Sequence, residues 1–406
     1  MRLFCILALL LVAACTPKPQ TVPAGTWRGV IELQGQQMPF LFEVTNDGTT
    51  TSAALINDTE RIALDEISYS GDSVRIVMHI FDVELRAKVS GDQLTGYYYK
   101  NYDPAFKLKF TATRGDSYLF ATNDSTRTTD FSGTYAATFI SDSQDTTVAV
   151  GILRQQGNQA FGTYLTPTGD YRYLSGNVIG DKLFLSTFDG NHAFLFTAVR
   201  NADGSLTGDF WSGRASHEQW TGIPDAKAKL PDAEALTYLK PGYDKMSFSF
   251  PDVSGKPVSL DDPKYKGKVI VLQLFGTWCP NCMDETKFLG PWYDQNKDRG
   301  VEIIGLAYER KPEFDYASGR VRKMIQKLNV HYDFLIAGTS DKEKAAETLP
   351  MLNKVVAFPT TIFIGKDGKV RHIRTGFEGP GTGIYYERHK ERFNEIINEL
   401  LSEKAM

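Results

Sequence analysis

The chain has 406 residues, which is enough for two or three domains. Hydrophobic residues make up 42% of it and aromatic residues 12%, as expected of packed globular cores, and 35 glycines suit a β-rich part with many turns. The formal net charge of −4 is small, so it gives no electrostatic argument for a nucleic-acid partner. The six histidines are not spaced with cysteines as a metal site requires.

Residues 1–14 have the character of an export signal peptide. Arg2 supplies a positive start, and residues 3–12 form an apolar core too short to span a bilayer, which needs about 20 residues. The run that ends in Ala14 and Cys15 resembles a bacterial lipoprotein cleavage box. It predicts that Cys15 becomes the acylated first residue, with residues 15–24 as a tether. The alternative is an ordinary signal peptide that is cut nearby.

Lipid on Cys15 would hold the protein on a membrane, because two or more acyl chains bind a bilayer effectively permanently. We therefore expect a cell-envelope location on the periplasmic face of a bacterial membrane. Thr16 follows Cys15 where a retention aspartate would otherwise stand, which favours the outer membrane.

Residues 25–225 are β in character, with short alternating runs and frequent Gly-Asp turns. Phe40, Phe42 and Val44 alternate in the way that half-buried strands do. We expect two β modules, at residues 25–120 and 131–225, joined by a polar linker at 121–130.

The two β modules show an internal repeat. The run Gly25-Thr26-Trp27 returns as Gly-Thr-Tyr ending at Tyr135, and the run Leu-Thr-Gly ending at Gly96 returns ending at Gly208. The offset drifts slowly, as small loop insertions in a duplicated module produce. Each copy offers about eight candidate strands, which permits a small closed barrel that can hold one apolar ligand. Two packed sheets per module, or one sandwich built from both copies, are the alternatives.

The C-terminal part alternates strand and helix patterns, after a second linker at residues 226–243 with a short helix expected within 226–240. This part, residues 244–406, is expected to be an α/β domain. The expected strands are 269–275, 301–308, 331–337, 361–364 and 370–373, and the expected helices are 283–295, 318–328, 342–349 and 385–401.

Two cysteines three apart, Cys279 and Cys282, directly follow the buried strand expected at 269–275. This places them at a helix N-terminus, where unpaired N–H groups and the helix dipole lower the pKa of a thiol. Cys5 leaves with the signal and Cys15 would carry lipid, so the pair provides the only thiols of the mature chain. A zinc site usually takes four ligands and no second pair exists, so a redox-active pair is favoured over a metal half-site. A purely structural disulfide is the other alternative, although so short a loop stabilises little.

The residues from Phe275 to Cys282 resemble the active site of thioredoxin-fold proteins, and more narrowly the TlpA/ResA branch of membrane-anchored thiol–disulfide oxidoreductases. Phe358 and Pro359 precede a strand, as the cis-proline segment of that family does, and Glu285 falls where the branch carries a carboxylate. The resemblance covers about residues 244–406 and implies a thioredoxin-like fold with one insertion.

The resemblance implies roles for individual residues. Cys279 would be the exposed attacking thiolate, and Cys282 would resolve the mixed disulfide. A cis Pro359 beside the cysteines would expose the backbone of Phe358 for pairing with a substrate strand. Trp278 and Pro280 would contact the substrate, with core packing as the alternative for Trp278.

Glu285 is the candidate proton acceptor for Cys282. Thioredoxins carry a buried aspartate where this chain has Gln273, which cannot titrate. Glu285 lies on the same helix face as Cys282 and could accept its proton if burial raises the pKa of the carboxyl group. The alternative is a solvated acid in the first helical turns.

These observations predict a cell-envelope thiol–disulfide oxidoreductase that needs no cofactor. We expect it to exchange disulfides with envelope proteins and to be recharged by an upstream thiol reductant, and the family resemblance implies that it acts as a reductant. Pro280 and Asn281 depart from the order that many relatives have, so the direction of electron flow stays open. The alternatives are a peroxiredoxin-like thiol peroxidase, and a ligand-binding lipoprotein whose redox domain is only a scaffold.

Overall fold

The computed structural model of the protein describes residues 21–47, 50–120 and 129–404. The predicted signal peptide and the predicted lipidation site, Cys15, lie outside these residues, and so does most of the predicted linker at 121–130. Across the described ranges, no helix is both long and apolar enough to cross a membrane.

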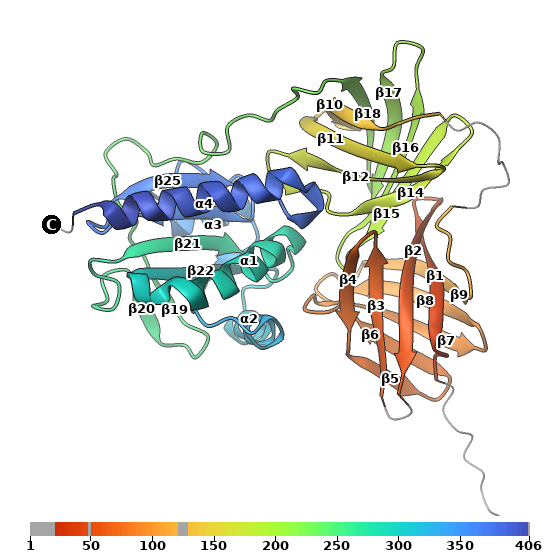
Figure 1. The fold of residues 1–406 in the computed structure, drawn as a ribbon. Coiled ribbons are helices and arrows are strands. Elements are labelled where there is room, and N and C mark those ends of the chain that lie inside the picture. The colour runs from red at the N-terminus through yellow and green to blue at the C-terminus, as the bar shows by residue number, and fades with distance from the viewer. Residues whose placement is uncertain (1–20, 48–49, 121–128, 405–406) are drawn as a thin grey trace, which may run out of the picture.

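The described part of the chain forms three units, two of strands and one of strands and helices (Figure 1). The first β unit is an antiparallel sheet in the order β4-β3-β2-β1-β9-β8-β7-β6-β5, with β4 and β5 as its edges. Its strands are β1 (Gly25–Leu33), β2 (Gln36–Asn46), β3 (Thr51–Asn57), β4 (Glu60–Leu64), β5 (Ile67–Ser70), β6 (Ser73–Val77), β7 (Val83–Ser90), β8 (Gln93–Lys100) and β9 (Lys107–Arg114).

The second β unit is a closed barrel. Its strand β12 pairs with both β11 and β14, so the sheet joins its own edge and leaves fewer unpaired backbone groups. Its strands are β10 (Gly133–Ser141), β11 (Thr146–Gln156), β12 (Gln159–Thr166), β13 (Gly169–Asp170), β14 (Leu174–Ile179), β15 (Lys182–Phe188), β16 (Ala193–Arg200), β17 (Leu206–Ser212) and β18 (Ser216–Pro224).

The duplication expected from the sequence is visible in the topology, because β10–β18 follow one another around the barrel as β1–β9 do around the first sheet. The repeated aromatic residue has the same role in both units. The indole of Trp27 donates a hydrogen bond to the carbonyl oxygen of Pro23 at 3.0 Å. The hydroxyl of Tyr135 donates to the carbonyl oxygen of Phe131, also four residues earlier, at 2.9 Å.

The repeated glycines, Gly96 in β8 and Gly208 in β17, lie where neighbouring strands approach closely. A Cβ atom at Gly96 would stand 1.9 Å from the carbonyl oxygen of Arg86, and one at Gly208 would stand 1.8 Å from that of Thr197. No side chain fits at either place, which explains why glycine is present in both copies.

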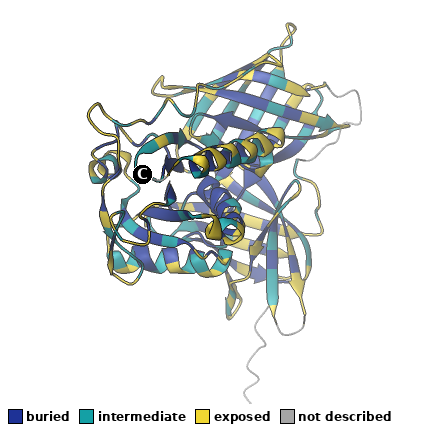
Figure 2. Cartoon of the chain, turned by 60° about the vertical axis from the view of Figure 1, so that its left-hand side comes forward, coloured by how far each residue is buried: buried dark blue, intermediate teal, exposed yellow. Residues whose placement is uncertain are grey.

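Aromatic side chains fill the interior of the barrel. Phe139, Phe196 and Trp220 are at most 1% exposed, and Phe196 stacks on Phe210 with ring centroids 4.4 Å apart. The position that barrel closure suggested for an apolar ligand is therefore occupied by the core. Figure 2 shows buried residues alternating with exposed ones along the strands.

The C-terminal unit is a thioredoxin-like α/β domain. Its central sheet has the order β23-β22-β21-β24-β25, in which β21–β23 are parallel and β24 and β25 antiparallel. The strands are β19 (Ser249–Pro251), β20 (Pro257–Ser259), β21 (Val269–Phe275), β22 (Val301–Glu309), β23 (Asp333–Thr339), β24 (Thr360–Ile364) and β25 (Val370–Thr375). The helices are α1 (Pro280–Asn296), η1 (Lys297–Arg299), α2 (Phe314–Leu328), α3 (Lys342–Thr348), η2 (Pro380–Thr382) and α4 (Ile384–Ser402).

Several expected elements differ from the structure, and α1, for example, begins at Pro280 rather than at 283. Helix α2 begins at Phe314 rather than at 318, and β23 begins at Asp333 rather than at 331. No helix forms in residues 226–240, all of which the structure describes. That segment pairs with the C-terminal unit instead, since the N–H of Lys240 donates to the carbonyl oxygen of Met351 at 2.8 Å.

The β units lie over the end of the C-terminal unit at which α1 begins. The end of β12 contacts η2, and the hydroxyl of Tyr316 donates to Asp82 of the first β unit at 2.9 Å. The ammonium group of Lys323 lies 2.7 Å from the carboxylate of Glu66. Both β units therefore contact the domain that carries the two cysteines.

Candidate active site

The two cysteines follow a tight turn between β21 and α1. A Cβ atom at Gly276 would stand 2.1 Å from Nε1 of Trp278, which donates to the carbonyl oxygen of Tyr308 at 2.8 Å. Glycine at 276 thus lets the indole fold back over the turn. The backbone N–H and hydroxyl of Thr277 donate to the buried carboxylate of Glu309 at 2.8 and 2.9 Å, and burial raises the pKa of Glu309.

Cys279 and Cys282 form a disulfide at the N-terminus of α1, with Cα atoms 5.2 Å apart. Cys279 is the N-cap residue of the helix, and its Sγ accepts the backbone N–H of Cys282 at 3.2 Å. Pro280 occupies the first helical turn, where its missing N–H leaves no partner unsatisfied. Charge on the Cys279 sulfur is favoured here by a hydrogen bond and by the helix dipole.

The peptide bond between Phe358 and Pro359 is cis, as the family resemblance implied. Sγ of Cys279 lies 3.5 Å from the carbonyl oxygen of Phe358. The ring of Phe358 lies between Trp278 and Tyr308, at centroid distances of 5.8 and 5.4 Å. The structure therefore brings the two cysteines, Trp278, Pro280 and the proline segment together.

Glu285 is buried rather than solvated, with 2% of its surface exposed. Its carboxylate accepts hydrogen bonds from Oγ1 of Thr361 at 2.6 Å and from Nε2 of Gln273 at 2.8 Å. Burial raises the pKa of Glu285 to about 7, against the opposing effect of these hydrogen bonds. Nε2 of Gln273 also lies 3.4 Å from the carbonyl oxygen of Cys282, so the glutamine lies between the acid and the second cysteine.

The expectation that Cys279 and the backbone of Phe358 are exposed is wrong. Cys279 is 5% exposed and Phe358 7%. The barrel turn at residues 166–172 lies on the start of α1, where Arg172 contacts Pro280. The ring of Phe358 is also covered by Trp278 and Tyr308 of its own unit. The cover by the barrel comes from outside the C-terminal domain, so no pattern within residues 244–406 predicts it.

The barrel contacts the redox motif directly. Nδ2 of Asn281 lies 3.3 Å from both the carbonyl oxygen and a carboxylate oxygen of Asp170. Nδ2 of Asn191 donates to the carbonyl oxygen of Trp278 at 2.8 Å, and the N–H of Gly379 donates to Asp170 at 2.7 Å. A Cβ atom at Gly169 would stand 2.6 Å from Nδ2 of Asn281, so the close approach depends on glycine.

One arginine lies among several acids at this contact. The guanidinium of Arg172, which is buried, forms ion pairs with Glu60 of the first β unit, Asp189 of the barrel and Asp284 of α1. Burial raises the pKa of Asp170 to about 7, although Gly379 and Arg172 oppose the shift. Burial would also raise the pKa of Asp189, but His192 and Arg172 lower it to about 2. The ion pairs thus join all three units.

A crevice of about 190 Å³ lies between the barrel and the redox motif. One wall belongs to the barrel and the other to the C-terminal unit, with Cys279 in the second wall. The barrel wall consists of Thr166, Thr168, Gly169, Asp170, Tyr171, His192 and Phe194, and the opposite wall of Trp278, Cys279, Pro280, Asn281 and Phe358.

Comparisons with known proteins agree with this geometry. A family model described as Redoxin matches residues 226–387. The thiol-disulfide oxidoreductase ResA of Bacillus thuringiensis subsp. konkukian (strain 97-27) is 32% identical over 159 residues, which are 39% of this chain and 78% of that protein. The chain belongs to the ResA-like thiol–disulfide oxidoreductases of the thioredoxin superfamily.

Two further proteins are similar to the C-terminal part of this chain. ResA of Bacillus subtilis (strain 168) is 27% identical over 138 residues, which are 34% of this chain and 69% of that protein. The crystal structure of a thiol:disulfide interchange protein from Chlorobium tepidum TLS has 23% identity and a TM-score of 0.31, and the match covers 39% of this chain and 96% of that one. The Redoxin match begins after β18, so both β units lie outside it.

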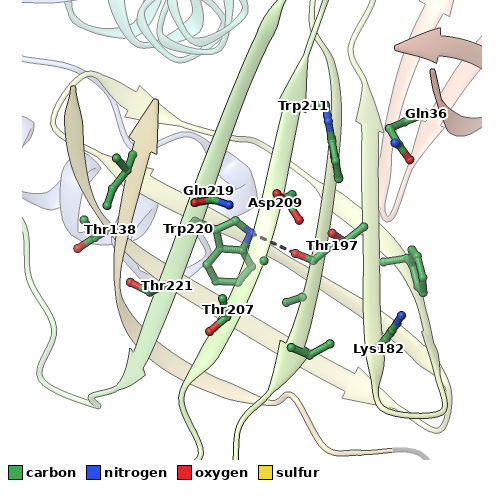
Figure 3. A pocket seen from close by; sticks show the side chains of 15 residues that line it. Gln36, Thr138, Lys182, Thr197, Thr207, Asp209, Trp211, Gln219, Trp220 and Thr221 are labelled. Carbon is green, nitrogen blue, oxygen red and sulfur yellow. Dashed lines mark hydrogen bonds between the residues drawn. The ribbon is translucent and has the colours of Figure 1, made fainter. Parts of the chain in front are cut away.

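A larger hollow, of about 550 Å³, lies on the outer face of the barrel of this ResA-like protein (Figure 3). Threonines and two tryptophans contribute to its lining, and Gln36 reaches it from the first β unit. All of its lining residues come from the two β units, so it takes no part in the disulfide site. Searched over the described residues, no group of three or more His, Cys, Asp or Glu side chains could hold a metal ion.

Several residues of the site were missed by the sequence analysis. Asp170, Arg172 and Asn191 reach the motif only because the barrel packs on it, and no local signal marks them. Arg310 was within reach of sequence reasoning, because it follows β22, whose carboxyl end adjoins that of β21. Its guanidinium lies 3.8 Å from the ring centroid of Trp278.

Proposed function

We propose that this protein is a cell-envelope thiol–disulfide oxidoreductase that exchanges disulfides with protein partners and works as a reductant. The observation that carries the proposal is the position of Cys279, whose sulfur caps α1 and accepts the N–H of Cys282. The similarity to relatives named thiol-disulfide oxidoreductase ResA supports a function in disulfide exchange. Lipid on Cys15 would anchor the chain, and an upstream thiol reductant would restore the dithiol.

The proposed exchange has two steps. In the reduced protein, the thiolate of Cys279 attacks one sulfur of a partner disulfide, forming a mixed disulfide and releasing the other partner sulfur as a thiolate. Cys282 then attacks the sulfur of Cys279, which re-forms the intramolecular disulfide and releases the partner as a dithiol. We propose that Glu285 accepts the proton of Cys282, because its buried carboxyl has a pKa raised to about 7 and is joined to the cysteine backbone through Gln273.

The substrate contacts are proposed to come from Trp278, Pro280, Phe358 and Pro359. The first three line the crevice beside Cys279, and Pro359 is buried next to Phe358. Because the barrel covers this surface, a protein partner must either present its cysteine through the crevice or displace the barrel. The β modules at 25–120 and 131–225 therefore act on access to the redox domain at 244–406.

A trapping experiment tests the proposal. In a Cys282→Ala variant, the second step is blocked, so envelope proteins should accumulate on Cys279 as mixed disulfides that a reductant releases. A Cys279→Ala, Cys282→Ala double variant is the matched control and should trap nothing. Reproducible recovery of a small set of proteins from the single variant alone supports the proposal. Equal recovery from both variants, or none from either, would contradict it.

A further inference from the structure

The crevice between the barrel and the redox motif is small and lies directly at the reactive sulfur. Its volume of about 190 Å³ is below the roughly 300–1,000 Å³ that is usual for pockets that hold drug-sized ligands. At about 30 Å³ for each water molecule, it has room for roughly six waters, so one molecule of the size of cysteine fits in it. A substrate strand of several residues does not fit between the two walls.

The walls of the crevice are held together by buried polar contacts. Arg172 on the barrel and Asp284 on α1 form an ion pair, and both residues are at most 4% exposed. Separating the walls would leave this pair and the hydrogen bonds between Asp170 and Asn281 without partners until water reached them. Because opening costs free energy, the closed arrangement is the predominant form that dissolved molecules encounter.

We propose that this crevice binds a low-molecular-weight thiol of about the size of cysteine, and that such a thiol reduces the Cys279–Cys282 disulfide while the barrel stays in place. This inference rests on the proposed function, because it assigns the chemical class of the upstream reductant. Protein partners would be reduced by the dithiol in the other half of the cycle, after the barrel has moved away from Cys279.

The chemistry of the walls suits such a ligand. The rings of Phe194 and Trp278 offer apolar surface to a methylene and a sulfur atom. His192 and Thr168 add polar groups on the barrel side, where the charged ends of an amino-acid thiol would lie. Nδ1 of His192 is 3.0 Å from Asp189 and its ring stacks on Phe194 at 4.7 Å, which fixes the imidazole in the wall.

The reduction balances with two molecules of thiol. The thiolate of the first attacks Sγ of Cys279, the bond between Cys279 and Cys282 breaks, and Cys282 leaves as a thiolate that takes up a proton. A second thiolate then attacks the sulfur of the bound first molecule and releases Cys279 as a thiolate. The two small thiols lose two electrons and form one small disulfide, and the protein gains them as a dithiol.

The test measures how fast thiols of increasing size reduce the oxidised full-length protein. Cysteine, glutathione and a folded protein dithiol are compared by acid quenching and counting of free thiols, with rates expressed per thiolate. An oxidised peptide of residues 275–285 provides the reference, because it has the same disulfide without the barrel. We expect the protein to prefer cysteine over glutathione by about tenfold more than the peptide does, with the protein dithiol slowest. Equal preferences in protein and peptide would overturn the proposal.

A substitution that fills the crevice gives a second readout. Thr168→Trp, at an exposed position on the rim, should slow reduction by cysteine about tenfold. Thr221→Trp, at a site that is also exposed and lies on the same barrel outside the crevice, should leave the rate unchanged. A Thr168→Trp variant that reacts as fast as the wild type would show that the thiol takes another route. If that variant does not fold, the size series on the wild type decides alone.

The outcomes separate this inference from the proposed function. If envelope proteins are trapped on Cys279 but the protein shows no more preference among thiols of different size than the peptide does, only the small-thiol site is contradicted. A selective size series with no trapped protein would keep the crevice and remove the protein partners.

Discussion

Asn281, between the two cysteines, gives its side-chain amide to Asp170 of the β barrel, with Nδ2 3.3 Å from both the carbonyl and a carboxylate oxygen. A residue of the redox motif is thus also a docking residue. A change that weakens the contact between the barrel and α1 should therefore expose the disulfide. A substitution in the motif should in turn alter that contact. The two β units are therefore part of the redox site, although the Redoxin match begins after them.

Removal of the Asp170 carboxylate should open the site. In an Asp170→Ala variant, the N–H groups of Gly379 and Arg172 and the amide of Asn281 lose a buried acceptor, which is worth about 1–3 kcal/mol. We expect a bulky maleimide to modify reduced Cys279 about tenfold faster than in the wild type, after correction by the rate with iodoacetamide.

The control for that experiment is Asp181→Ala, in the exposed turn between β14 and β15 of the same barrel. Its modification rate should equal that of the wild type. Equal rates for Asp170→Ala and Asp181→Ala would mean that the Asp170 contact does not limit access to Cys279.

The same carboxyl group should make access depend on pH. Burial raises the pKa of Asp170 to about 7 in the docked protein, so its contribution to docking is present at low pH and is lost as pH rises through 7. Corrected modification of Cys279 by the bulky maleimide should therefore accelerate as pH rises from about 4 to 7 and should level off above pH 7. An Asp170→Asn variant should lose most of this dependence, and an unchanged profile would assign it to another group.

Glu285 should make stability fall as pH rises. Its pKa is raised by burial from 4.5 to about 7, so its contribution is complete below about pH 4.5 and is lost through pH 7, for a change of about 3 kcal/mol. Denaturant unfolding of wild type and Glu285→Gln at pH 5 and pH 8 should show that the variant loses less stability between the two values. Equal losses of stability in the wild type and in Glu285→Gln would contradict the raised pKa of Glu285.

Glu285 should also determine how the rate of the second exchange step depends on pH, if it accepts the proton of Cys282. The second step of exchange in the wild type should accelerate as pH rises through about 7, when the carboxylate forms. In Glu285→Gln this inflection should disappear, and the rate at pH 8 should fall by roughly 100-fold. A variant with the wild-type profile would limit Glu285 to packing.

The glycine repeat predicts a contrast in stability between two substitutions. Gly208→Ala would place a Cβ atom 1.8 Å from the carbonyl oxygen of Thr197 and should destabilise the protein by about 1–3 kcal/mol. Gly319→Ala, on α2, meets no atom within 4 Å and should stabilise by about 0.5–1 kcal/mol. Denaturant midpoints measure both, and similar changes for the two variants would contradict the close approach of β16 and β17.

Local patterns predicted most of the C-terminal domain. The strand at 269–275 and the last helix were predicted within one residue of β21 and α4, because continuous apolar runs and helical spacing are properties of neighbouring residues. The starts of α2 and β23 were missed by a few residues, since their ends depend on packing. The helix expected in 226–240 was wrong, because backbone groups of that segment pair with Met351 and Thr375 instead.

The sequence by itself determined the pair of cysteines, its place between a strand and a helix, and the duplication of the β region, whereas the cis-proline segment was implied by the family resemblance. Each of these is written in residues close together or in a repeat that can be read along one chain. Only the tertiary structure decided that Cys279 is buried, that the barrel encloses the crevice, and that Arg172 joins acids from three units. Those facts come from surfaces more than 100 residues apart, as Arg172 and Asp284 are. Packing between such distant surfaces depends on shape and charge in three dimensions, and no local pattern records it.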